Sequence, residues 1–480
     1  MQSNITKKFA KTKILATLGP ATFEKDTIIS LMNAGINGVR LNFSHGSFEF
    51  FSQVFGNIQK AIEETNSPLA TLIDLQGPKI RIGELSEPNI LIAKGELLEI
   101  TISDILGNKN IISTSYKPLP KDASIGNIIL IDDGLIRLKI TEIKENSVIC
   151  IVEEGGILKP KKGMNLPGMN LSTPSITEKD LANLDFALNY NVDYIALSFV
   201  RNANDILELK KWLNNKGKKI PIIAKIEKKE AVELFDEILA VSDGIMVARG
   251  DLGVEMEAHQ VPVVQKEIIR KCNRVGKLVI TATQMLESMV NNPIPTRAEA
   301  SDVANAVWDG TDVVMLSAET SVGRYPLQTV VTMNNIIVSA ESFPQNRKEC
   351  DFAVPENIST KLFDSFCKGL CSIAEQTNVK AIVVYTHKGR TALALSKYKP
   401  TSRIVAISDK PDTMNRLALK WGTTSIYSMV PQNQEHAVEE AKKLMIKSGN
   451  VTLGDIMLVA SAAPMTDEKR IIWMKFVEIK

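Results

Sequence analysis

The chain has 480 residues, which is too long for one ordinary hydrophobic core and predicts roughly two to four domains. Its 57 Lys and Arg residues nearly balance 55 Asp and Glu, and the net charge of +2 excludes a protein that binds nucleic acid or anionic membranes through bulk charge. A content of 44% hydrophobic and 23% charged residues, with no apolar run of about 18 residues, excludes wholesale disorder and a membrane span. The polar start of the chain, Met1–Lys13, predicts a cytoplasmic protein without a secretory signal.

Eight short apolar runs, rich in Ile, Val and Leu, recur along the chain without the polar alternation of a half-exposed strand. They are Lys13–Thr17, Gly38–Phe43, Ala70–Leu75, Asp193–Phe199, Pro221–Glu227, Gly244–Gly250, Leu278–Thr283 and Val313–Ser317. Such runs are typical of parallel strands that are buried on both faces. Helical patterns lie between most of them, namely Thr27–Ala34, Phe50–Thr65, Ala203–Asn215, Val261–Val275 and Arg297–Asp309.

The repeated alternation of strand and helix predicts an α/β fold, and its eight repeats favour a (β/α)8 TIM barrel. A doubly wound open sheet produces the same alternation, so the periodicity alone does not establish that the sheet closes. If it does close, the carboxyl ends of all eight strands should meet at one site.

One interval, from about Gln76 to Pro174, interrupts this rhythm, because on the order of 100 residues is far more than a usual βα loop contains. Its apolar residues fall in short alternating runs between turn-rich stretches: Ile90–Ile92, Leu97–Ile102, Ile128–Ile131, Leu135–Ile140 and Val148–Val152. This pattern predicts a small antiparallel β-barrel inserted in the third βα loop. An insert at this position would form a lid over the carboxyl end of the barrel, where barrel enzymes have their active sites.

After about Phe343 the pattern begins again. The polar stretch Pro344–Pro355 starts and ends with proline and predicts a linker, and strand and helix patterns alternate from Thr360 onwards. We therefore expect three domains. They are a catalytic barrel of residues 1–75 and 175–343, an inserted lid of residues 76–174, and a C-terminal α/β regulatory domain of residues 344–480.

The five cysteines, few, odd in number and scattered, disfavour a disulfide framework. Cys367 and Cys371 are four residues apart on a predicted helix, but no nearby His or second Cys pair completes a metal site. We expect reduced, structural thiols at all five positions: Cys150, Cys272, Cys350, Cys367 and Cys371.

Polar or ionisable residues occur at the end of nearly every predicted strand. In chain order they are Thr17 and Gly19; Arg40, Asn42, Ser44 and His45; Asp74; Ser198; Lys225 and Glu227; Arg249, Gly250 and Asp251; Thr281, Thr283 and Gln284; and Ser317, Glu319 and Thr320. Turn chemistry alone places polar residues after strands, so any single one is a weak signal. Agreement across eight strands is much harder to explain in that way.

The residue types at these ends point to phosphoryl chemistry. The carboxylates Glu227 and Asp251 suit a hard divalent cation such as Mg²⁺, which takes a few protein oxygens together with substrate phosphate. The cations Arg40, Lys225 and Arg249 suit a phosphorylated anion. Such a site stabilises the charge of a group in transfer and needs no protein nucleophile.

Simpler explanations compete for single members of this set. Lys225 and Glu227 are two residues apart and would also fit a surface ion pair, and His45 is either a general base or a hydrogen-bonding bystander. The sequence has no G-x-x-x-x-G-K-[ST] loop and no zinc-ligand pattern, which disfavours a P-loop ATPase and a zinc enzyme.

Long motifs across the barrel and its insert resemble the pyruvate kinase family, in a bacterial-type form. They are KILATLGPA at Lys13–Ala21, VRLNFSHG at Val39–Gly46, DLQGPKIR at Asp74–Arg81, KGMNLPG at Lys162–Gly168, KIE at Lys225–Glu227, MVARGDLGVE at Met246–Glu255, TATQMLESM at Thr281–Met289, PTRAEA at Pro295–Ala300 and DGTDVVMLSAET at Asp309–Thr320. The resemblance implies transfer of a phosphoryl group between phosphoenolpyruvate and ADP, which gives pyruvate and ATP at the end of glycolysis.

Carried over by position, the resemblance implies that Arg40 holds the phosphoryl group and that Lys225 stabilises the phosphoryl group and the enolate in the transition state. Glu227 and Asp251 would ligate Mg²⁺ or Mn²⁺. The backbone of Gly250 and Asp251 and the hydroxyl of Thr283 would receive the substrate carboxylate, at the start of a short helix.

The resemblance also assigns Thr283 to the place where the enolate is protonated, through water. It places the nucleotide beneath the insert, and a lid that closes over ADP would exclude water and limit hydrolysis. The implied nucleotide contacts are Asn42, Phe43, Ser44, His45, Arg81 and Lys162.

One departure from the family pattern concerns potassium. Potassium-dependent members carry Glu where this chain has Lys79 and Thr where it has Leu75. A lysine ammonium is a compact +1 charge like K⁺, so we expect an enzyme that works without potassium, unless Lys79 points to solvent. Asn42, Ser44 and Asp74 match the remaining potassium ligands, so a possible potassium site would comprise these three residues and the position of Leu75.

In the family the C-terminal domain carries the allosteric site and contributes to a homotetramer. The loop Thr386–Thr391, which comprises Thr386, His387, Lys388, Gly389, Arg390 and Thr391, resembles the family's phosphate-binding loop. A later effector loop is poorly matched around Ser461–Asp467, which argues against activation by a sugar bisphosphate. A sugar monophosphate, AMP or no effector remain as alternatives.

Two other functions compete with an active kinase. A catalytically silent regulatory paralogue would be expected to lack one of the catalytic side chains, and all of them are present. Another barrel enzyme that acts on phosphoenolpyruvate, such as a lyase or mutase, would not need the insert or its Lys162 and Arg81. We expect neither nucleic acid nor a membrane among the partners of this protein.

Overall fold

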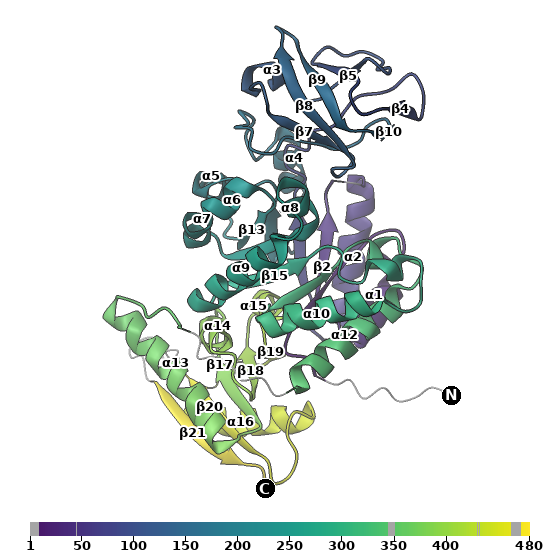
Figure 1. Ribbon diagram of the computed structural model, residues 1–480. Helices are drawn as coiled ribbons and strands as arrows, with labels where there is room; N and C mark the ends of the chain where they lie inside the picture. Colours follow the sequence, from purple (N-terminus) through teal and green to yellow (C-terminus); the bar gives the residue numbers. More distant parts are fainter. Residues whose placement is uncertain (1–8, 45, 344–350, 430, 432, 462–471) are drawn as a thin grey trace.

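Three bodies follow one another along the molecule, with the insert at one end, the barrel in the middle and the C-terminal domain at the other end (Figure 1). The computed structural model describes residues 9–44, 46–343, 351–429, 431, 433–461 and 472–480. Among these residues, no helix combines the length and the apolar character that crossing a membrane requires.

The central body is a closed barrel of parallel strands in the order β1-β16-β15-β14-β13-β12-β3-β2. Its strands are β1 (Lys13–Thr17), β2 (Gly38–Asn42), β3 (Ala70–Asp74), β12 (Tyr194–Leu197), β13 (Ile222–Ile226), β14 (Gly244–Ala248), β15 (Leu278–Ala282) and β16 (Val313–Leu316). Each of the eight predicted runs forms one of them, so the barrel is confirmed and the open-sheet alternative is wrong. Nearly all of these strand residues are buried, because helices cover the outer face and side chains fill the interior.

The run Gly244–Gly250 ends as a strand earlier than predicted. Arg249 and Gly250 already belong to the helix α8 (Arg249–Glu255). The Arg249 guanidinium donates hydrogen bonds to the carbonyls of Ala282 (3.2 Å) and Thr283 (2.7 Å), which holds the start of α8 against the end of β15.

The helices of the barrel follow the predicted pattern, with short additional segments. They are α1 (Lys25–Ala34), α2 (Phe48–Thr65), α4 (Glu178–Ala187), α5 (Ala203–Asn215), α6 (Lys229–Glu233), α7 (Phe235–Val241), α9 (Val261–Val275), the 3-10 turn η1 (Glu287–Val290), α10 (Arg297–Asp309), α11 (Ala318–Ser321) and α12 (Pro326–Ser342). Local chemistry sets their ends. Helix α10 starts at a reciprocal capping box between Thr296 and Glu299 and stops at Gly310, which adopts a left-handed φ of 94°.

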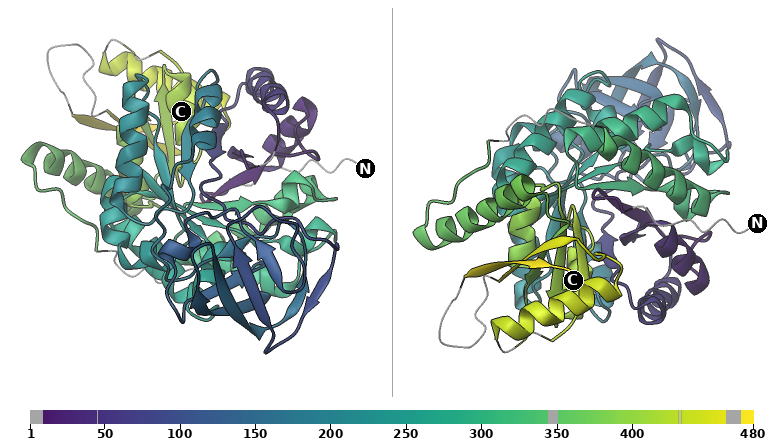
Figure 2. Two further views of the ribbon diagram at one scale, coloured as in Figure 1. Left: turned by 90° about the horizontal axis from the view of Figure 1, so that it is seen from above. Right: turned by 90° about the horizontal axis from the view of Figure 1, so that it is seen from below.

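The insert follows β3 and lies over one side of the barrel's carboxyl end (Figure 2). It holds a six-stranded sheet in the order β11-β7-β8-β9-β5-β6 and a two-stranded sheet of β10 and β4. The elements are β4 (Ile90–Ile92), β5 (Leu97–Thr101), β6 (Ile111–Ser113), α3 (Leu119–Asp122), β7 (Ile128–Ile131), β8 (Ile136–Ile143), β9 (Ser147–Glu154), β10 (Gly156–Leu158) and β11 (Met164–Asn165).

The insert departs from the predicted antiparallel barrel in two respects: β5 and β6 run parallel to each other, and the six-stranded sheet is not closed. Single bridges from Arg81 to Gly163 and from Ile82 to Thr114 lie between the two edge strands and bring the sheet close to closure. The insert has its own apolar cluster, which includes Leu98 and Ile129.

The C-terminal domain is a five-stranded sheet in the order β19-β18-β17-β20-β21, in which only β21 runs antiparallel to its neighbour. Its elements are α13 (Ile358–Thr377), β17 (Ala381–Tyr385), α14 (Arg390–Lys397), β18 (Arg403–Ser408), α15 (Pro411–Leu417), β19 (Thr423–Tyr427), α16 (Gln434–Lys447), β20 (Ile456–Ser461) and β21 (Trp473–Glu478). Ala418 and Leu419 from this domain pack into the apolar cluster at the floor of the barrel.

Four of the five cysteines are buried free thiols, namely Cys150, Cys272, Cys367 and Cys371, as predicted. Cys350 lies outside the described residues. Burial raises the pKa of the Cys150 thiol to about 12, which suits an inert structural side chain.

Candidate active site at the carboxyl end of the barrel

Side chains from β2, β3 and β13 converge at the carboxyl end of the barrel. Arg40 donates from Nε and Nη2 to Oδ2 of Asp74, each at 2.7 Å, and from Nη1 to the hydroxyl of Thr17 at 3.1 Å. Asp74 in turn lies 3.3 Å from Nζ of Lys225 through its other oxygen, Oδ1. The neighbouring strands β2 and β3, and β13 beyond the intervening β12, therefore contribute to one continuous charge network.

Lys225 is the centre of this network. Its Nζ donates to Oγ of Ser198 at 2.6 Å and forms an ion pair with Oε1 of Glu227 at 2.7 Å. The side chain of Lys225 is 11% exposed and that of Glu227 is 1% exposed. The pair is therefore buried, and the alternative of a surface ion pair does not describe it.

The surroundings keep these groups charged. Burial alone would lower the pKa of Lys225, but the carboxylates of Asp74 and Glu227 raise it above its usual value. Burial likewise opposes ionisation of Asp74, yet the nearby charges of Lys225 and Arg40 hold its pKa below the ordinary value. The site thus presents a fixed ammonium and a fixed guanidinium at neutral pH.

Glu227 and Asp251 have the character of a site for a divalent cation. Burial raises the pKa of Glu227, and the negative charge of Asp251 raises it further, while Lys225 acts in the opposite direction. Asp251, which is half-buried, adds negative charge near the buried Glu227, and a bound cation would offset the charge of both. The described residues hold no group of three or more His, Cys, Asp and Glu side chains that could hold a metal, so a cation here would take its other oxygens from water or substrate, as Mg²⁺ commonly does.

The ends of β14 and β15 form the opposite wall of the site. The Gly250 N–H donates to Oγ1 of Thr283 at 2.8 Å, and this hydroxyl donates to the carbonyl of Ala282 at 2.7 Å. Thr283 and Gln284 adopt positive φ angles of 68° and 53°, which are uncommon for residues with a side chain. Such strain clusters at functional sites, where the surrounding structure holds it in place.

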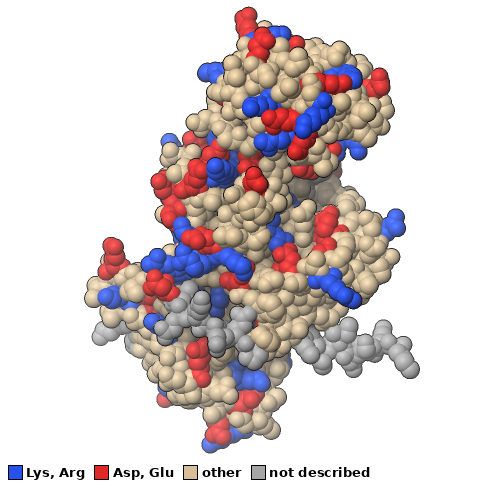
Figure 3. Space-filling view, viewed as in Figure 1, with Lys and Arg blue, Asp and Glu red and all other residues tan. Residues whose placement is uncertain are grey.

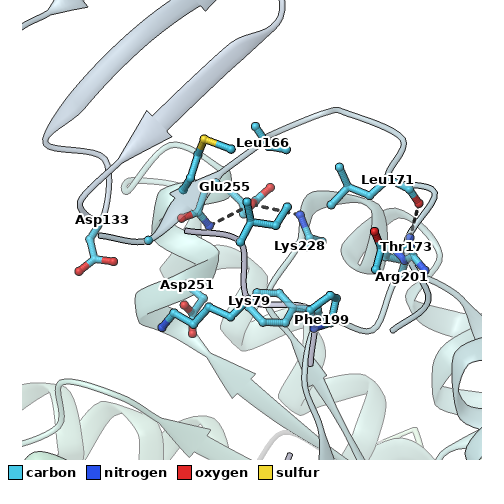
Figure 4. A pocket seen from close by; sticks show the side chains of 15 residues that line it. Lys79, Asp133, Leu166, Leu171, Thr173, Phe199, Arg201, Lys228, Asp251 and Glu255 are labelled. Atoms are coloured by element: carbon cyan, nitrogen blue, oxygen red, sulfur yellow. Dashed lines mark hydrogen bonds and ion pairs between the residues drawn. The ribbon is translucent and has the colours of Figure 1, made fainter. Parts of the chain in front are cut away.

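A cleft separates the insert from the barrel, and this face of the molecule is hollowed there (Figure 3). Positive and negative side chains are interspersed over the face, in keeping with the balanced composition. Lys79 and Asp251 both line the cleft, and the Lys79 side chain extends toward Asp251 (Figure 4). Lys79 is an exposed residue, but it lies in the cleft between the two bodies and not on an outer surface.

The two predicted nucleotide contacts of the insert lie at its junction with the barrel. Lys162 forms an ion pair with Oδ1 of Asp132 at 2.8 Å. Arg81 donates from Nη1 to the carbonyl of Lys161 at 3.0 Å and bridges to Gly163 through its backbone. Arg81 is therefore fixed to the turn that carries Lys162, and the Lys162 ammonium is fixed to the turn between β7 and β8.

The remaining predicted positions follow β2. Asn42 and Ser44 lie beside each other, because the Asn42 Oδ1 accepts a hydrogen bond from the Ser44 backbone N–H at 3.2 Å, and Phe43 is buried in the barrel core. His45 lies outside the described residues.

Sequence reasoning gave no role to two groups at this end of the barrel. The Ser198 hydroxyl accepts a hydrogen bond from Nζ of Lys225 and donates one to the carbonyl of Leu75 at 2.7 Å. These two contacts fix the ammonium in place. Lys228 and Asn165 both donate to Oε1 of Glu255 at 3.2 Å, and this contact joins the barrel to the insert (Figure 4). Lys228 follows the KIE motif directly, and this position was the only available signal.

The C-terminal loop Thr386–Thr391 follows β17 and leads into α14. His387 forms a hydrogen-bonded pair through Nδ1 with Oδ1 of Asp409 at 2.7 Å. Gly389 adopts a left-handed φ of 76°, and Arg390 lies over the ring of Phe363. The later effector loop lies outside the described residues beyond Ser461.

A closed parallel barrel whose carboxyl end holds fixed cations beside paired carboxylates defines a barrel enzyme suited to phosphorylated, anionic substrates. Comparisons with known proteins identify the family. The family description "Pyruvate kinase, barrel domain" matches residues 9–330, and "Pyruvate kinase, alpha/beta domain" matches residues 364–471.

Individual relatives agree over most of the chain. A pyruvate kinase of Staphylococcus epidermidis is 42% identical over 461 residues, which cover 96% of this chain and 78% of the relative. A pyruvate kinase of Geobacillus stearothermophilus is 42% identical over 458 residues, with coverage of 95% and 78%. The crystal structure of a pyruvate kinase from Cryptosporidium parvum superimposes with a TM-score of 0.91 at 36% identity, covering 98% of this chain and 96% of that one.

The chain therefore belongs to the pyruvate kinase family, and the resemblance inferred from its motifs is confirmed. Membership makes it a phosphotransferase, and members of the family use a divalent metal cofactor.

Proposed function

We propose that the cluster around Lys225 binds phosphoenolpyruvate and promotes transfer of its phosphoryl group to ADP. The observation that carries this proposal is the buried Lys225 ammonium, held by Ser198, Asp74 and Glu227 at distances of 2.6 to 3.3 Å. Because these contacts exist before substrate binds, the positive charge needs no reorganisation when negative charge develops on the enolate and the phosphoryl group. Arg40, fixed by Asp74, supplies a second cation for the phosphoryl oxygens.

Glu227 and Asp251 would hold the divalent cation, with Mg²⁺ or Mn²⁺ as the expected ions. The cation supplies charge stabilisation for the phosphoryl oxygens when bound. Glu227 is positioned for this role by the backbone N–H of Phe199, which donates to its Oε2 at 2.7 Å. Its orientation is therefore set by the chain and not by the ion.

Thr283 and Gly250 would receive the substrate carboxylate. In the structure the Gly250 N–H donates to the Thr283 hydroxyl, so the two groups lie next to each other. A substrate carboxylate could accept the hydrogen bond of the Gly250 N–H in place of the Thr283 hydroxyl, and it could accept a second hydrogen bond from that hydroxyl. Thr283 is also the residue we propose for relaying a proton to the enolate through water, and its positive φ is in keeping with a position fixed for function.

Nucleotide binding would use the Asn42–Ser44 segment, His45, and the insert residues Arg81 and Lys162. The junction between insert and barrel supports this proposal, because Ile80 and Gly163, next to Arg81 and Lys162 in the chain, line the cleft. Closure of the insert would bring Arg81 and Lys162 over the phosphates of ADP and exclude water.

We propose that the enzyme works without potassium. Asp74, one of the matched potassium positions, already accepts hydrogen bonds or ion pairs from Arg40 and Lys225, and the Leu75 carbonyl accepts the Ser198 hydroxyl. A monovalent ion would have to compete for both. Lys79 extends toward Asp251 from the neighbouring segment and supplies a positive charge in the same cleft (Figure 4).

The organisation into three domains, residues 1–75 with 175–343, 76–174 and 344–480, is also a proposal. The separate apolar clusters of barrel, insert and C-terminal sheet support it. From the family resemblance we propose a cytoplasmic homotetramer. We place a phosphorylated effector, if one exists, at the loop Thr386–Thr391, whose Gly389 turn and helix start suit phosphate.

Pyruvate release from phosphoenolpyruvate with ADP and Mg²⁺, measured with and without K⁺ at matched ionic strength, tests these proposals. Equal turnover in both conditions supports the kinase and the role of Lys79. Turnover that requires K⁺ keeps the kinase and removes the role of Lys79. No turnover in either condition, even with phosphorylated activators, would favour a silent paralogue.

A further inference from the structure

A cavity of about 300 Å³ opens on the outer wall of the barrel, away from the carboxyl end. Helix α2, the turn after α4, Thr71 of β3 and Asn415 of α15 surround it, so the barrel and the C-terminal domain both contribute. This volume is at the lower end of the range typical of small-molecule sites, and junctions between domains are a common place for them.

The cavity has an apolar floor. Phe55 and Ile58 are buried there, and Tyr190 stacks on Phe55 with ring centroids 4.4 Å apart and an interplanar angle of 5°. The Tyr190 hydroxyl is fixed by a hydrogen bond with Ser52 at 2.8 Å. These contacts hold the two rings in place, so the floor exists without a ligand.

Neutral amide side chains form the rim. They are Gln59, Asn189, Asn191 and Asn415, and no charged side chain of the described residues lines the cavity. Oδ1 of Asn415 accepts from the Leu69 N–H at 3.3 Å, and Nδ2 of Asn189 donates to carbonyls of its own turn. Within the described part of the chain, no hydrogen bond engages Nδ2 of Asn415 or Oδ1 of Asn189 and Asn191. The rim therefore offers unused donors as well as unused acceptors.

Gly56 provides an independent observation. It lies in the middle of α2, where glycine costs about 1 kcal/mol relative to alanine. Its φ is not positive, and a Cβ built on it would meet nothing within 4 Å. Nothing in its own chain therefore requires a glycine, and Gly56 lines the cavity, where a side chain would occupy the open space.

We propose that this cavity binds a flat, uncharged nitrogen heterocycle of the nucleobase class. The ring would pack on the floor formed by Phe55, Ile58 and Tyr190, close to the bare backbone of Gly56. Its edge, which carries both donors and acceptors, would pair with the amide groups of the rim. The neutral lining disfavours a phosphate or a carboxylate, which would be buried without a counter-charge.

Adenine is a suitable ligand for the test, measured by saturation-transfer NMR and by the shift in Tm. ADP and Mg²⁺ are kept at saturation so that the catalytic site is occupied. We expect saturable adenine binding and an increased Tm, since a ligand that binds only the folded state stabilises it. Absence of saturable binding at millimolar adenine would overturn the proposal.

The variant Gly56→Leu fills the cavity and should abolish adenine binding. Gly369→Leu is the matched control, because Gly369 also lies inside a helix, α13, and its Cβ also meets nothing within 4 Å. The control should bind adenine like the unmodified protein. Adenine binding that persists in Gly56→Leu would overturn the assignment. If that variant folds poorly, Gly56→Ala, which helix propensity favours, gives a second test through weakened binding.

Asn415→Asp separates heterocycle recognition from simple apolar binding. The aspartate keeps the acceptor for the Leu69 N–H, replaces the Nδ2 donors with a second acceptor oxygen and adds a negative charge. Loss of one hydrogen bond predicts roughly three- to tenfold weaker adenine binding. Toluene binding as tightly as adenine, with no effect of Asn415→Asp, would overturn the nucleobase class.

Discussion

The carboxyl end of the barrel and the loop Thr386–Thr391 both carry clustered polar residues, but they are built differently. In the barrel, charges from β2, β3 and β13 pair with one another in a buried setting, where Asp74 is 2% exposed and Lys225 is 11% exposed. In the C-terminal loop, the residues come from one strand end, and His387 is 43% exposed in its pair with Asp409. The first region is preorganised by its own contacts, whereas the second is largely screened by water.

This difference has an energetic consequence. Removing one member of a buried network leaves its partners uncompensated, which is strongly destabilising or inactivating. Removing one member of an exposed pair changes little, because such pairs contribute about 0 to 1 kcal/mol. Substitutions in the two regions should therefore differ by orders of magnitude in their effect on turnover.

The largest effect is expected for Lys225→Met. The variant keeps the stem of the side chain but loses the ammonium between Asp74 and Glu227, so kcat should fall about 10³-fold, the upper range for loss of one preorganised charge donor. Steady-state pyruvate release measures it. Lys229→Met, at an exposed lysine that pairs with Glu233, is the control and should retain full turnover. A Lys225→Met enzyme within tenfold of the unmodified one would contradict the central role.

Asp251→Asn should act mainly on the metal. The amide keeps the shape but loses a negative charge, so the Mg²⁺ concentration for half-maximal activity should rise about 100-fold, as for loss of an oxygen ligand. Direct Mn²⁺ binding, followed by electron paramagnetic resonance, should weaken in parallel. If Mn²⁺ affinity stays the same while turnover falls, Asp251 acts on the substrate and not on the cation.

Lys79→Glu should create a potassium requirement. The substitution removes a positive charge beside Asp251 and adds a negative one, so turnover without K⁺ should fall about tenfold, an effect of about 1.4 kcal/mol. Addition of K⁺ at constant ionic strength should restore most of it. The unmodified enzyme, assayed in the same buffers, should show the same turnover with and without K⁺. A variant that ignores K⁺ would show that Lys79 has no part in the monovalent site.

Asp193 precedes β12 at the floor of the barrel, at the end opposite the candidate active site. Asp193→Asn tests whether titration of this carboxyl changes the stability of the protein. Burial raises the pKa of Asp193 to about 7 from an ordinary 3.8, despite a hydrogen bond from the Thr71 N–H. A carboxyl whose pKa is raised on folding stabilises the native state below its unfolded pKa and loses that contribution as pH rises toward 7.

Asparagine does not titrate and retains an acceptor for the Thr71 N–H. The stability of Asp193→Asn relative to the unmodified protein should therefore increase by about 2 kcal/mol between pH 5 and pH 7, at 1.36 kcal/mol per pKa unit. Urea unfolding at several pH values measures this. Asp185→Asn, at an exposed position, provides a flat baseline. A constant difference across the pH range would rule out the titration.

The comparison of the two regions also explains what the sequence could predict. Strands buried on both faces leave continuous apolar runs, and the topology of a barrel then brings their ends together, so Arg40, Asp74 and Lys225 were placed at one site without coordinates. The short strands β6 and β11, of three and two residues, leave too little alternation and were missed.

Contacts that depend on folding in three dimensions could not be predicted. Ser198 follows a strand like many turn residues, and only the structure shows that it holds the Lys225 ammonium. Glu255 lies 27 residues from Lys228, with nothing in the chain to indicate that they pair. The cavity beside Gly56 is likewise formed by segments that are remote in sequence.

The smallest effect is expected for Arg390→Ala. Arg390 is exposed and contacts the ring of Phe363 with 5.9 Å between the guanidinium carbon and the ring centroid, a contact worth about 0.5 to 1 kcal/mol at exposed sites. Turnover without an effector should stay within about twofold, because no charge in the barrel depends on this side chain.

A response to glucose 6-phosphate or to AMP, if the unmodified enzyme shows one, should be lost in Arg390→Ala, since a guanidinium at a helix start is suited to phosphate. Lys380→Ala, outside the loop, is the control. A tenfold loss of basal turnover in Arg390→Ala would mean that the loop is coupled to the barrel even without a ligand. That result would contradict the conclusion that the barrel site is preorganised whereas the loop Thr386–Thr391 acts only when a ligand binds.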